Sequence, residues 1–281
     1  MNEVVGKSEN INMELKTRFS HPVSDEVRQQ VVAELRKIEI EHDVDILFAC
    51  ESGSRAWGFA SPDSDYDVRF IYKHRPEWYL TVKPGRDVIE IPISDELDIS
   101  GWDLKKALGL LLASNPTLFE WINSPIVYEA DANFVETIRS LSNVYFSNEK
   151  GYHHYVSMAR KNFRGYLQGE TVRTKKYLYV LRPLLAARWI KANLGIPPMR
   201  FATLVDTLLV DQASLTKEID QLLEIKMAQS EAEYGPRYVQ IHQWIENELA
   251  SEDSWTGPYH HDKDVVILDQ VMRDFVLSDR R

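Results

Sequence analysis

The chain has 281 residues, 44% of them hydrophobic, so it is long enough and apolar enough to fold as one large domain or two ordinary ones. Its single cysteine, Cys50, excludes an intrachain disulfide and favours a reducing cytoplasm. The net charge of −10 argues against broad wrapping of nucleic acid, and neither a membrane span nor a signal-peptide pattern is expected from the apolar runs.

The first expected elements are a helix and a strand. Residues 1–22 are polar and irregular, which predicts a mobile arm or an edge strand. A helix is expected from Ser24 to about Glu41, because Ser24 suits an N-cap and apolar residues recur behind it at helical spacing. The apolar run from Val44 to Cys50 predicts a buried strand, and the helix should pack on the sheet that this strand begins.

A Gly-Ser turn and a pair of aspartates follow this strand. Gly53 and Ser54 form the turn, and a second strand is expected from Tyr66 to Tyr72. Side chains alternate along a strand, so Asp65 and Asp67 should lie on one face. Two crowded carboxylates repel each other unless a cation lies between them, and their oxygens suit Mg²⁺ or Mn²⁺ bound together with substrate phosphates.

The Gly-Ser turn itself is a candidate phosphate site. Gly53 allows the backbone to come close to a phosphate, and the N–H groups of Gly53, Ser54 and Arg55 could donate to it at the start of a short helix. Two other interpretations remain open. The acids could open a calcium loop, although Val68 and His74 stand where that loop needs Gly and Glu, or they could be ordinary turn residues.

Strands and then helices are expected farther along. Residues 88–93 and 96–99 predict a hairpin, and in it Glu90 and Asp98 each stand between apolar residues, where an unpartnered acid is costly to bury. The polar residues 147–151 suggest a linker. The helices expected after the hairpin cover about 101–115, 117–123, 134–141, 152–167, 174–194, 201–210, 215–228, 238–249 and 265–276, the last in an acidic tail.

Basic residues are concentrated in the second half. From Met158 to Lys191 there are nine of them against the lone Glu170, in a chain that is acidic overall. Lys175, Tyr179 and Arg182 should lie near one helix face, as should Lys176 and Tyr179, and Arg160 and Arg164 are one turn apart on the preceding helix. Such helices suit a polyphosphate or an RNA end, although a solvated face that compensates acidic neighbours remains an alternative.

An apolar strand, Gly-Ser, ten residues and then Asp-x-Asp entering another strand resemble the signature of the polymerase-beta-like nucleotidyltransferase superfamily. Three longer stretches are similar to its branch called the RNA repair pathway DNA polymerase beta family, and together they span most of residues 44–201: GSRAWGFASPDSDYDVRFIY, GWDLKKALGLLLASNPTLFEWINSPIVY and KKYLYVLRPLLAARWI.

The resemblance implies an α/β (α+β) nucleotidyltransferase core with a mixed sheet at 23–146, followed by an all-α helical domain at 147–250 and an acidic tail with a short helix at 251–281. It also implies a third carboxylate. We expect this to be Asp98, with Glu90 as the rival. Asp65, Asp67 and Asp98 would then be the catalytic residues and the ligands of two Mg²⁺ (or Mn²⁺) ions.

The implied reaction transfers a nucleoside monophosphate from an NTP to a hydroxyl and releases pyrophosphate. The nucleotide would be bound by Gly53, Ser54, Arg55, Lys175, Lys176, Tyr179 and Arg182, and RNA or phosphate by Arg160 and Arg164. The expected acceptor is an RNA end, such as that of a tRNA. A small-molecule or protein acceptor, and a non-catalytic nucleotide- or RNA-binding module, stay open.

Overall fold

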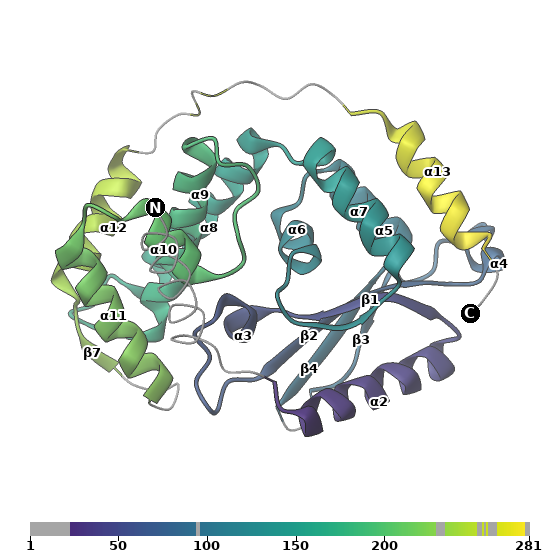
Figure 1. Ribbon diagram of the computed structural model, residues 1–281, viewed down its shortest axis with the longest axis horizontal. Coiled ribbons are helices and arrows are strands. Elements are labelled where there is room, and N and C mark those ends of the chain that lie inside the picture. The colour runs from purple at the N-terminus through teal and green to yellow at the C-terminus, as the bar shows by residue number, and fades with distance from the viewer. Residues whose placement is uncertain are drawn as a thin grey trace, which may run out of the picture.

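A five-stranded mixed sheet forms the first half of the molecule (Figure 1). The structure is a computed structural model, and it describes residues 23–93, 96–228, 234–251, 255, 257 and 263–278. The sheet order is β3-β4-β2-β1-β5, in which β2 and β4 run parallel and the other neighbours antiparallel. The strands are β1 (Asp45–Glu51), β2 (Tyr66–Lys73), β3 (Val88–Glu90), β4 (Leu97–Asp103) and β5 (Val127–Ala130).

Helices cover both faces of this sheet, which accounts for the nearly continuous runs of buried residues in β1 and β2. On one face, α2 (Asp25–His42) buries Val31, Leu35 and Ile38 against residues such as Phe70. On the other face, Phe48 and Ile71 join a second cluster with the helices that follow β4. These helices are α5 (Leu104–Leu112), α6 (Pro116–Ile122) and α7 (Ala132–Tyr145); the short α3 (Gly53–Trp57) and α4 (Pro76–Tyr79) connect strands.

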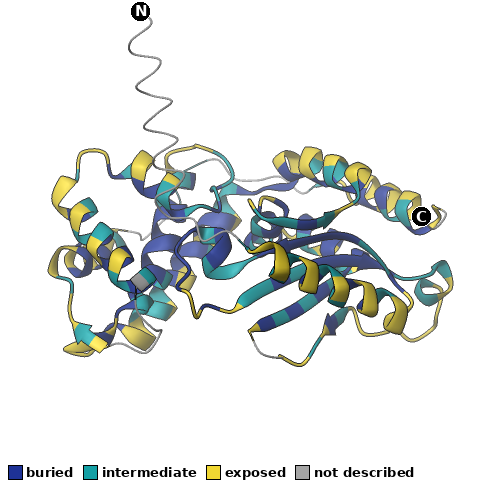
Figure 2. Ribbon diagram, turned by 60° about the horizontal axis from the view of Figure 1, so that its bottom comes forward, coloured by how far each residue is buried: buried dark blue, intermediate teal, exposed yellow. Residues whose placement is uncertain are grey.

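The second half is helical, which confirms the predicted architecture. A separate apolar cluster fills it, and α9 (Lys175–Lys191) is buried on most sides (Figure 2). Its other elements are α8 (Asn148–Tyr166), α10 (Phe201–Leu208), α11 (Ala213–Ala228), α12 (Val239–Ser251) and a small two-stranded sheet of β6 (Thr171–Arg173) and β7 (Tyr234–Pro236). No helix in the described ranges is long and apolar enough to cross a membrane.

Several predicted boundaries were wrong. Residues 101–103 continue β4 instead of opening a helix, and the Asp103 side chain caps α5 by accepting from the Lys105 N–H at 2.8 Å. Residues 147–151 are no linker, because Ser147 is the N-cap of α8. The strands β5, β6 and β7 were not predicted. The predicted N-terminal arm at 1–22 and the Ser94-Asp95 link lie outside the described residues.

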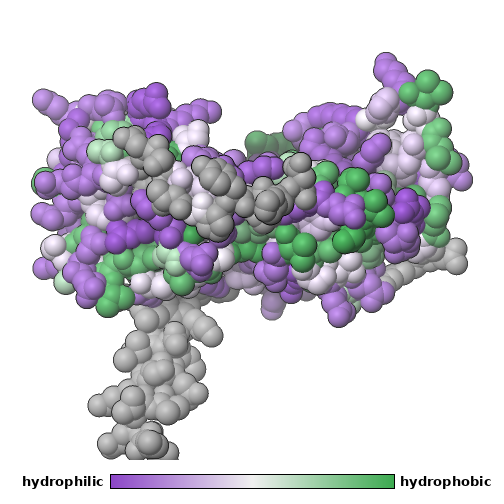
Figure 3. Space-filling view, turned by 90° about the horizontal axis from the view of Figure 1, so that it is seen from above, coloured by the Kyte–Doolittle hydropathy of each residue, from purple (hydrophilic) through white to green (hydrophobic). Residues whose placement is uncertain are grey.

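The last helix, α13 (Val265–Val276), returns to the sheet half and packs beside α5 (Figure 1). Leu268, Val271 and Val276 are buried in the same cluster as Phe48. The predicted division, with a first domain that ends at 146 and a separate tail, therefore omits a helix that completes the first domain. Figure 3 shows apolar side chains on the half of the molecule that carries α13, whose exposed face includes Val266 and Ile267.

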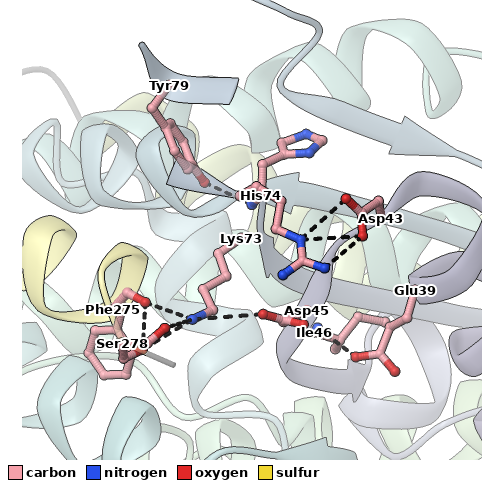
Figure 4. A network of polar contacts seen from close by, with 10 residues as sticks. Glu39, Asp43, Asp45, Ile46, Lys73, His74, Tyr79, Phe275 and Ser278 are labelled. Atoms are coloured by element: carbon pink, nitrogen blue, oxygen red, sulfur yellow. Dashed lines mark hydrogen bonds and ion pairs between the residues drawn. The ribbon is translucent and has the colours of Figure 1, made fainter. Parts of the chain in front are cut away.

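Lys73 links the sheet to the C-terminal end of α13 through hydrogen bonds (Figure 4). This buried lysine at the end of β2 donates to the Phe275 carbonyl at 2.7 Å and to Ser278 Oγ at 3.1 Å, and its Nζ lies 3.7 Å from Asp45 Oδ2. A cation suits this place, because the last carbonyls of a helix have no intrahelical donor and carry partial negative charge.

We expect Lys73→Met to loosen α13 and to lower the free energy of unfolding by about 2–3 kcal/mol, the usual worth of hydrogen bonds to a charged group. Hydrogen exchange of the α13 amides and urea unfolding measure the two effects. Lys37→Met is the control, because Lys37 is exposed on α2 and only pairs with Glu34. Unchanged protection of α13 in the Lys73 variant would contradict the assignment.

Candidate active site

Asp67 and Asp98 lie side by side at one end of the sheet. Strands β2 and β4 are parallel, and their register pairs Asp67 with Asp98. Both side chains remain open to solvent, at 29% and 33% exposure. Only the family resemblance led us to expect Asp98 near Asp67, because the register of two distant strands is set by tertiary packing and not by local sequence.

An arginine that was not predicted bridges the two acids. Arg69 NH2 donates to Asp67 Oδ1 at 3.0 Å and to Asp98 Oδ2 at 2.7 Å, and its NH1 donates to the Asp98 carbonyl at 2.8 Å. A carboxylate has two oxygens and about four acceptor sites, so the bond from Arg69 does not by itself exhaust the acceptor capacity of either acid. Arg69 thereby fixes the orientation of both side chains.

The Gly-Ser turn lies directly against Asp67. Gly53 has φ +56°, and a Cβ placed on it would come within 1.9 Å of Asp67 Oδ2. The Ser52 N–H donates to the Asp67 carbonyl at 2.8 Å, which ties the turn to β2. Only glycine fits both this backbone conformation and this approach. The carboxylate and the predicted phosphate-binding turn are therefore adjacent.

The turn before β2 is held from two directions. The Arg55 side chain is buried, donates to the Ser64 carbonyl at 2.6 Å and the Asp65 carbonyl at 3.3 Å, and stacks 3.8 Å from the Tyr66 ring. From α11, the buried Lys226 Nζ donates to Ser61 Oγ at 2.5 Å. Lys226 was not predicted, and nothing local in its sequence indicates this role.

Asp65 and Glu90 complete the account of the predicted acids. Asp65 is exposed just before β2, and Glu90 is exposed on the edge strand β3, where it pairs with Arg86. Glu90 stands opposite Ser100 of β4 and not beside Asp67. Within the described ranges, no group of three or more His, Cys, Asp or Glu side chains is placed to hold a metal ion. The close pair of carboxylates is thus Asp67 and Asp98.

Glu51, at the end of β1, binds the backbone N–H of Asp67. Its buried carboxylate accepts from the Asp67 N–H at 2.8 Å and from the Tyr128 hydroxyl. Burial raises the pKa of Glu51 from 4.5 to about 7, although the hydrogen bonds from Tyr128 and Asp67 oppose the shift. Sequence reasoning missed this residue; its signal is an acid that directly follows the apolar strand ending at Cys50.

We expect Glu51 to make stability depend on pH. Its folded-state pKa lies above the ordinary value of 4.5, so the native protein binds more protons than the unfolded chain, and stability falls as pH rises from 4.5 to about 7. Glu51→Gln should remove this loss, which a shift of this size puts at about 3 kcal/mol. Urea unfolding near both ends of the window tests it, with the exposed Glu90→Gln as control. An equal pH dependence in Glu51→Gln and the wild type would contradict the assignment.

Residues of α9 approach the Gly-Ser turn from the helical half. Trp57, at the end of α3, has its ring 5.8 Å from that of Tyr179, edge to face. Lys176 Nζ lies 4.9 Å from the Tyr179 ring centre. Arg182 lies 4.6 Å from the Trp57 ring, but it is only 3% exposed and pairs with Glu120 of α6 at 2.8 Å. A nucleotide phosphate could reach Arg182 only if that pair opened.

The remaining predicted basic residues lie farther out. Lys175 is half-buried at the first position of α9. Arg160 donates to the Leu249 carbonyl of α12 at 3.4 Å, whereas Arg164 is exposed in the last turn of α8. The structure thus brings Tyr179 and Arg182 to Trp57 of α3, the helix that carries the Gly-Ser turn, with Lys176 beside Tyr179. Arg164 stays on the outer surface.

Comparisons with known proteins identify relatives of this chain. The model of a family described as the RNA repair pathway DNA polymerase beta family matches residues 27–274. The uncharacterized protein YcgL of Bacillus subtilis (strain 168) is 49% identical over 223 residues, which cover 79% of this chain and 85% of that protein. A nucleotidyltransferase-like protein from Exiguobacterium sibiricum 255-15 is 14% identical and covers 86% of this chain and 74% of its own, with a TM-score of 0.26, too low for inference.

Proposed function

Because the chain belongs to the RNA repair pathway DNA polymerase beta family, we propose that it is a metal-dependent nucleotidyltransferase of the cytoplasm. It transfers a nucleoside monophosphate from an NTP to a hydroxyl of an RNA end, such as that of a tRNA, and releases pyrophosphate. The observation that carries the proposal is the pair of solvent-accessible carboxylates, Asp67 and Asp98, beside the glycine of a Gly-Ser turn.

The carboxylates have distinct tasks in this proposal. Asp65, Asp67 and Asp98 would hold two Mg²⁺ or Mn²⁺ ions, whose charge would stabilise the attacking and leaving oxygens. Oxygen-only ligands and the space kept by Gly53 fit such a hard cation. Asp98 takes the proton of the attacking hydroxyl or orients that hydroxyl, and Arg69 keeps both acids in position.

The nucleotide is bound from both halves of the molecule. The backbone N–H groups of Gly53, Ser54 and Arg55 donate to its phosphates, and the Ser54 hydroxyl adds a further donor. From α9, Lys175 or Lys176 neutralises charge on the leaving pyrophosphate, and Tyr179 packs on the base. Arg182 contributes mainly by holding Trp57 and Glu120 together, since it is buried between them.

A second candidate function rests on Arg69. Its guanidinium already compensates both acids, so the same site could bind a nucleotide or RNA without catalysing transfer. The two candidates differ in whether pyrophosphate is released. Acceptors other than RNA, either a small molecule or a protein hydroxyl, fit the first candidate with a different product.

The deciding experiment incubates the protein with each α-³²P-labelled NTP, Mg²⁺ and total RNA, and follows both the label and the pyrophosphate. Label on RNA, lost on chelation with EDTA, supports the proposal. Pyrophosphate release with label on a small molecule or protein would keep the transferase proposal and show that the acceptor is not RNA. Nucleotide binding without pyrophosphate release would support the second candidate.

A further inference from the structure

A lysine lies between two tyrosine rings on the surface of the helical half. Lys176 Nζ is 4.1 Å from the centre of the Tyr166 ring and 4.9 Å from that of the Tyr179 ring. Tyr166 ends α8 and is 48% exposed, so its ring is open to a ligand. Each contact is within the distance at which a cation is attracted to an aromatic face.

This arrangement is unusual for an acidic chain. Asp and Glu outnumber Lys and Arg by 43 to 33, yet Lys176 pairs with no carboxylate among the described residues. The exposed Lys161 and Arg164 stand on the same helix as Tyr166, five and two residues before it. Lys176 therefore provides the positive charge at both rings, and it attracts an anionic ligand that also presents flat apolar faces.

The same contacts lead back to the candidate active site. Tyr179 joins Lys176 to Trp57, whose ring lies 5.8 Å from that of Tyr179. Trp57 is the last residue of α3, the helix that begins at Gly53. Tyr166, Lys176, Tyr179 and Trp57 thus form an unbroken series, which we call the aromatic track, from the outer surface to the Gly-Ser turn.

We propose that the outer part of the aromatic track, Tyr166 and Lys176, binds the single-stranded end of an RNA acceptor whose terminal hydroxyl reaches the Gly-Ser turn. The inference rests on the proposed function and adds where the acceptor lies. A base stacks on the Tyr166 ring and a phosphate meets Lys176, so that Lys175 remains for the leaving pyrophosphate. Stacking on aromatic side chains together with a cationic path is the general means by which proteins hold single strands.

A nucleic acid fits this surface better than a protein does. The Tyr166 side chain is 48% exposed, and a cation accompanies it instead of the apolar neighbours that form the core of a protein interface. Each base offers a flat face, whatever the sequence, so a strand can use successive rings. Binding should therefore depend strongly on salt and weakly on base sequence.

The test measures the Kd of a fluorescein-labelled single-stranded oligoribonucleotide for the full chain by fluorescence anisotropy at several salt concentrations. Tyr166→Ala should weaken binding roughly tenfold, because stacking of one base is lost, and Tyr166→Phe should restore it. Lys176→Met should also lower the slope of log Kd against log salt by about 0.7, the value for one phosphate contact on a single strand.

Lys105→Met, at an exposed position of α5, is the charge-matched control and should leave the Kd and the slope unchanged. An oligoribonucleotide Kd that is the same in Tyr166→Ala and the wild type, or no binding at all, overturns the inference even if nucleotidyl transfer is observed. Track-dependent binding without pyrophosphate release supports the inference and instead removes the proposed transferase activity, so the two failures are distinguishable.

Discussion

Asp67→Asn is expected to reduce nucleotidyl transfer by on the order of a hundredfold or more while the protein stays folded. Asparagine keeps the shape of the side chain and can still accept from Arg69, but it lacks the negative charge that would hold a divalent cation. Transfer is measured as pyrophosphate release under saturating Mg²⁺, and folding by circular dichroism and the urea midpoint. A variant that keeps more than about a hundredth of the rate would remove Asp67 from the catalytic set.

The matched comparison is between the two candidates for the third carboxylate. Asp98→Asn should behave like Asp67→Asn, because Asp98 lies opposite Asp67 and shares Arg69 with it. Glu90→Gln should keep nearly full activity, because Glu90 is exposed on β3 and pairs with Arg86. The reverse outcome, with activity lost in Glu90→Gln and retained in Asp98→Asn, would exchange the two assignments.

Gly53→Ala is expected to cause the second large effect. The added methyl group would lie 1.9 Å from Asp67 Oδ2, and the backbone φ of +56° is strained for alanine. The turn or the carboxylate must move, and a displacement of about 1 Å near reacting groups can cost about a hundredfold in rate. Steady-state transfer and the Kd for Mg-NTP, measured by isothermal titration, report the two consequences.

Gly109→Ala provides the control for this substitution. Gly109 lies inside α5, and a Cβ there would meet nothing within 4 Å. Alanine should therefore stabilise the helix by about 0.5–1 kcal/mol and leave transfer unchanged. If Gly53→Ala were as active as Gly109→Ala, the close approach of the turn to Asp67 would have no role in function.

The long periodic elements were predictable because their signals are local. The helix after Ser24 and the helix 265–276 were placed within a residue of their ends, and the two strands around the Gly-Ser turn were found. β5 has only four residues and β6 and β7 three each, too few for a recognisable alternation. Their partner strands are distant along the chain, so these segments form strands because of that pairing and not because of intrinsic β-propensity.

The candidate site was predictable only in part, for a similar reason. Asp65, Asp67 and the Gly-Ser turn are near one another in sequence, whereas the position of Asp98 depends on the register of a distant strand. Arg69 had a usable signal, since strand alternation puts it on the same face as Asp67. Lys226 had none, because its contact with Ser61 joins elements far apart in the chain. The catalytic and nucleotide-binding roles themselves stay predictions.

The return of α13 to the sheet affects how the protein is made. Synthesis proceeds from the N-terminus, so the ribosome completes α7 at Tyr145 well before it reaches Val265. During that interval the nascent sheet half lacks the side chains of Leu268, Val271 and Val276, and the apolar surface that they later cover is open to chaperones and to other chains. A stop codon anywhere between the two helices would therefore release a product with an incomplete core in its N-terminal half.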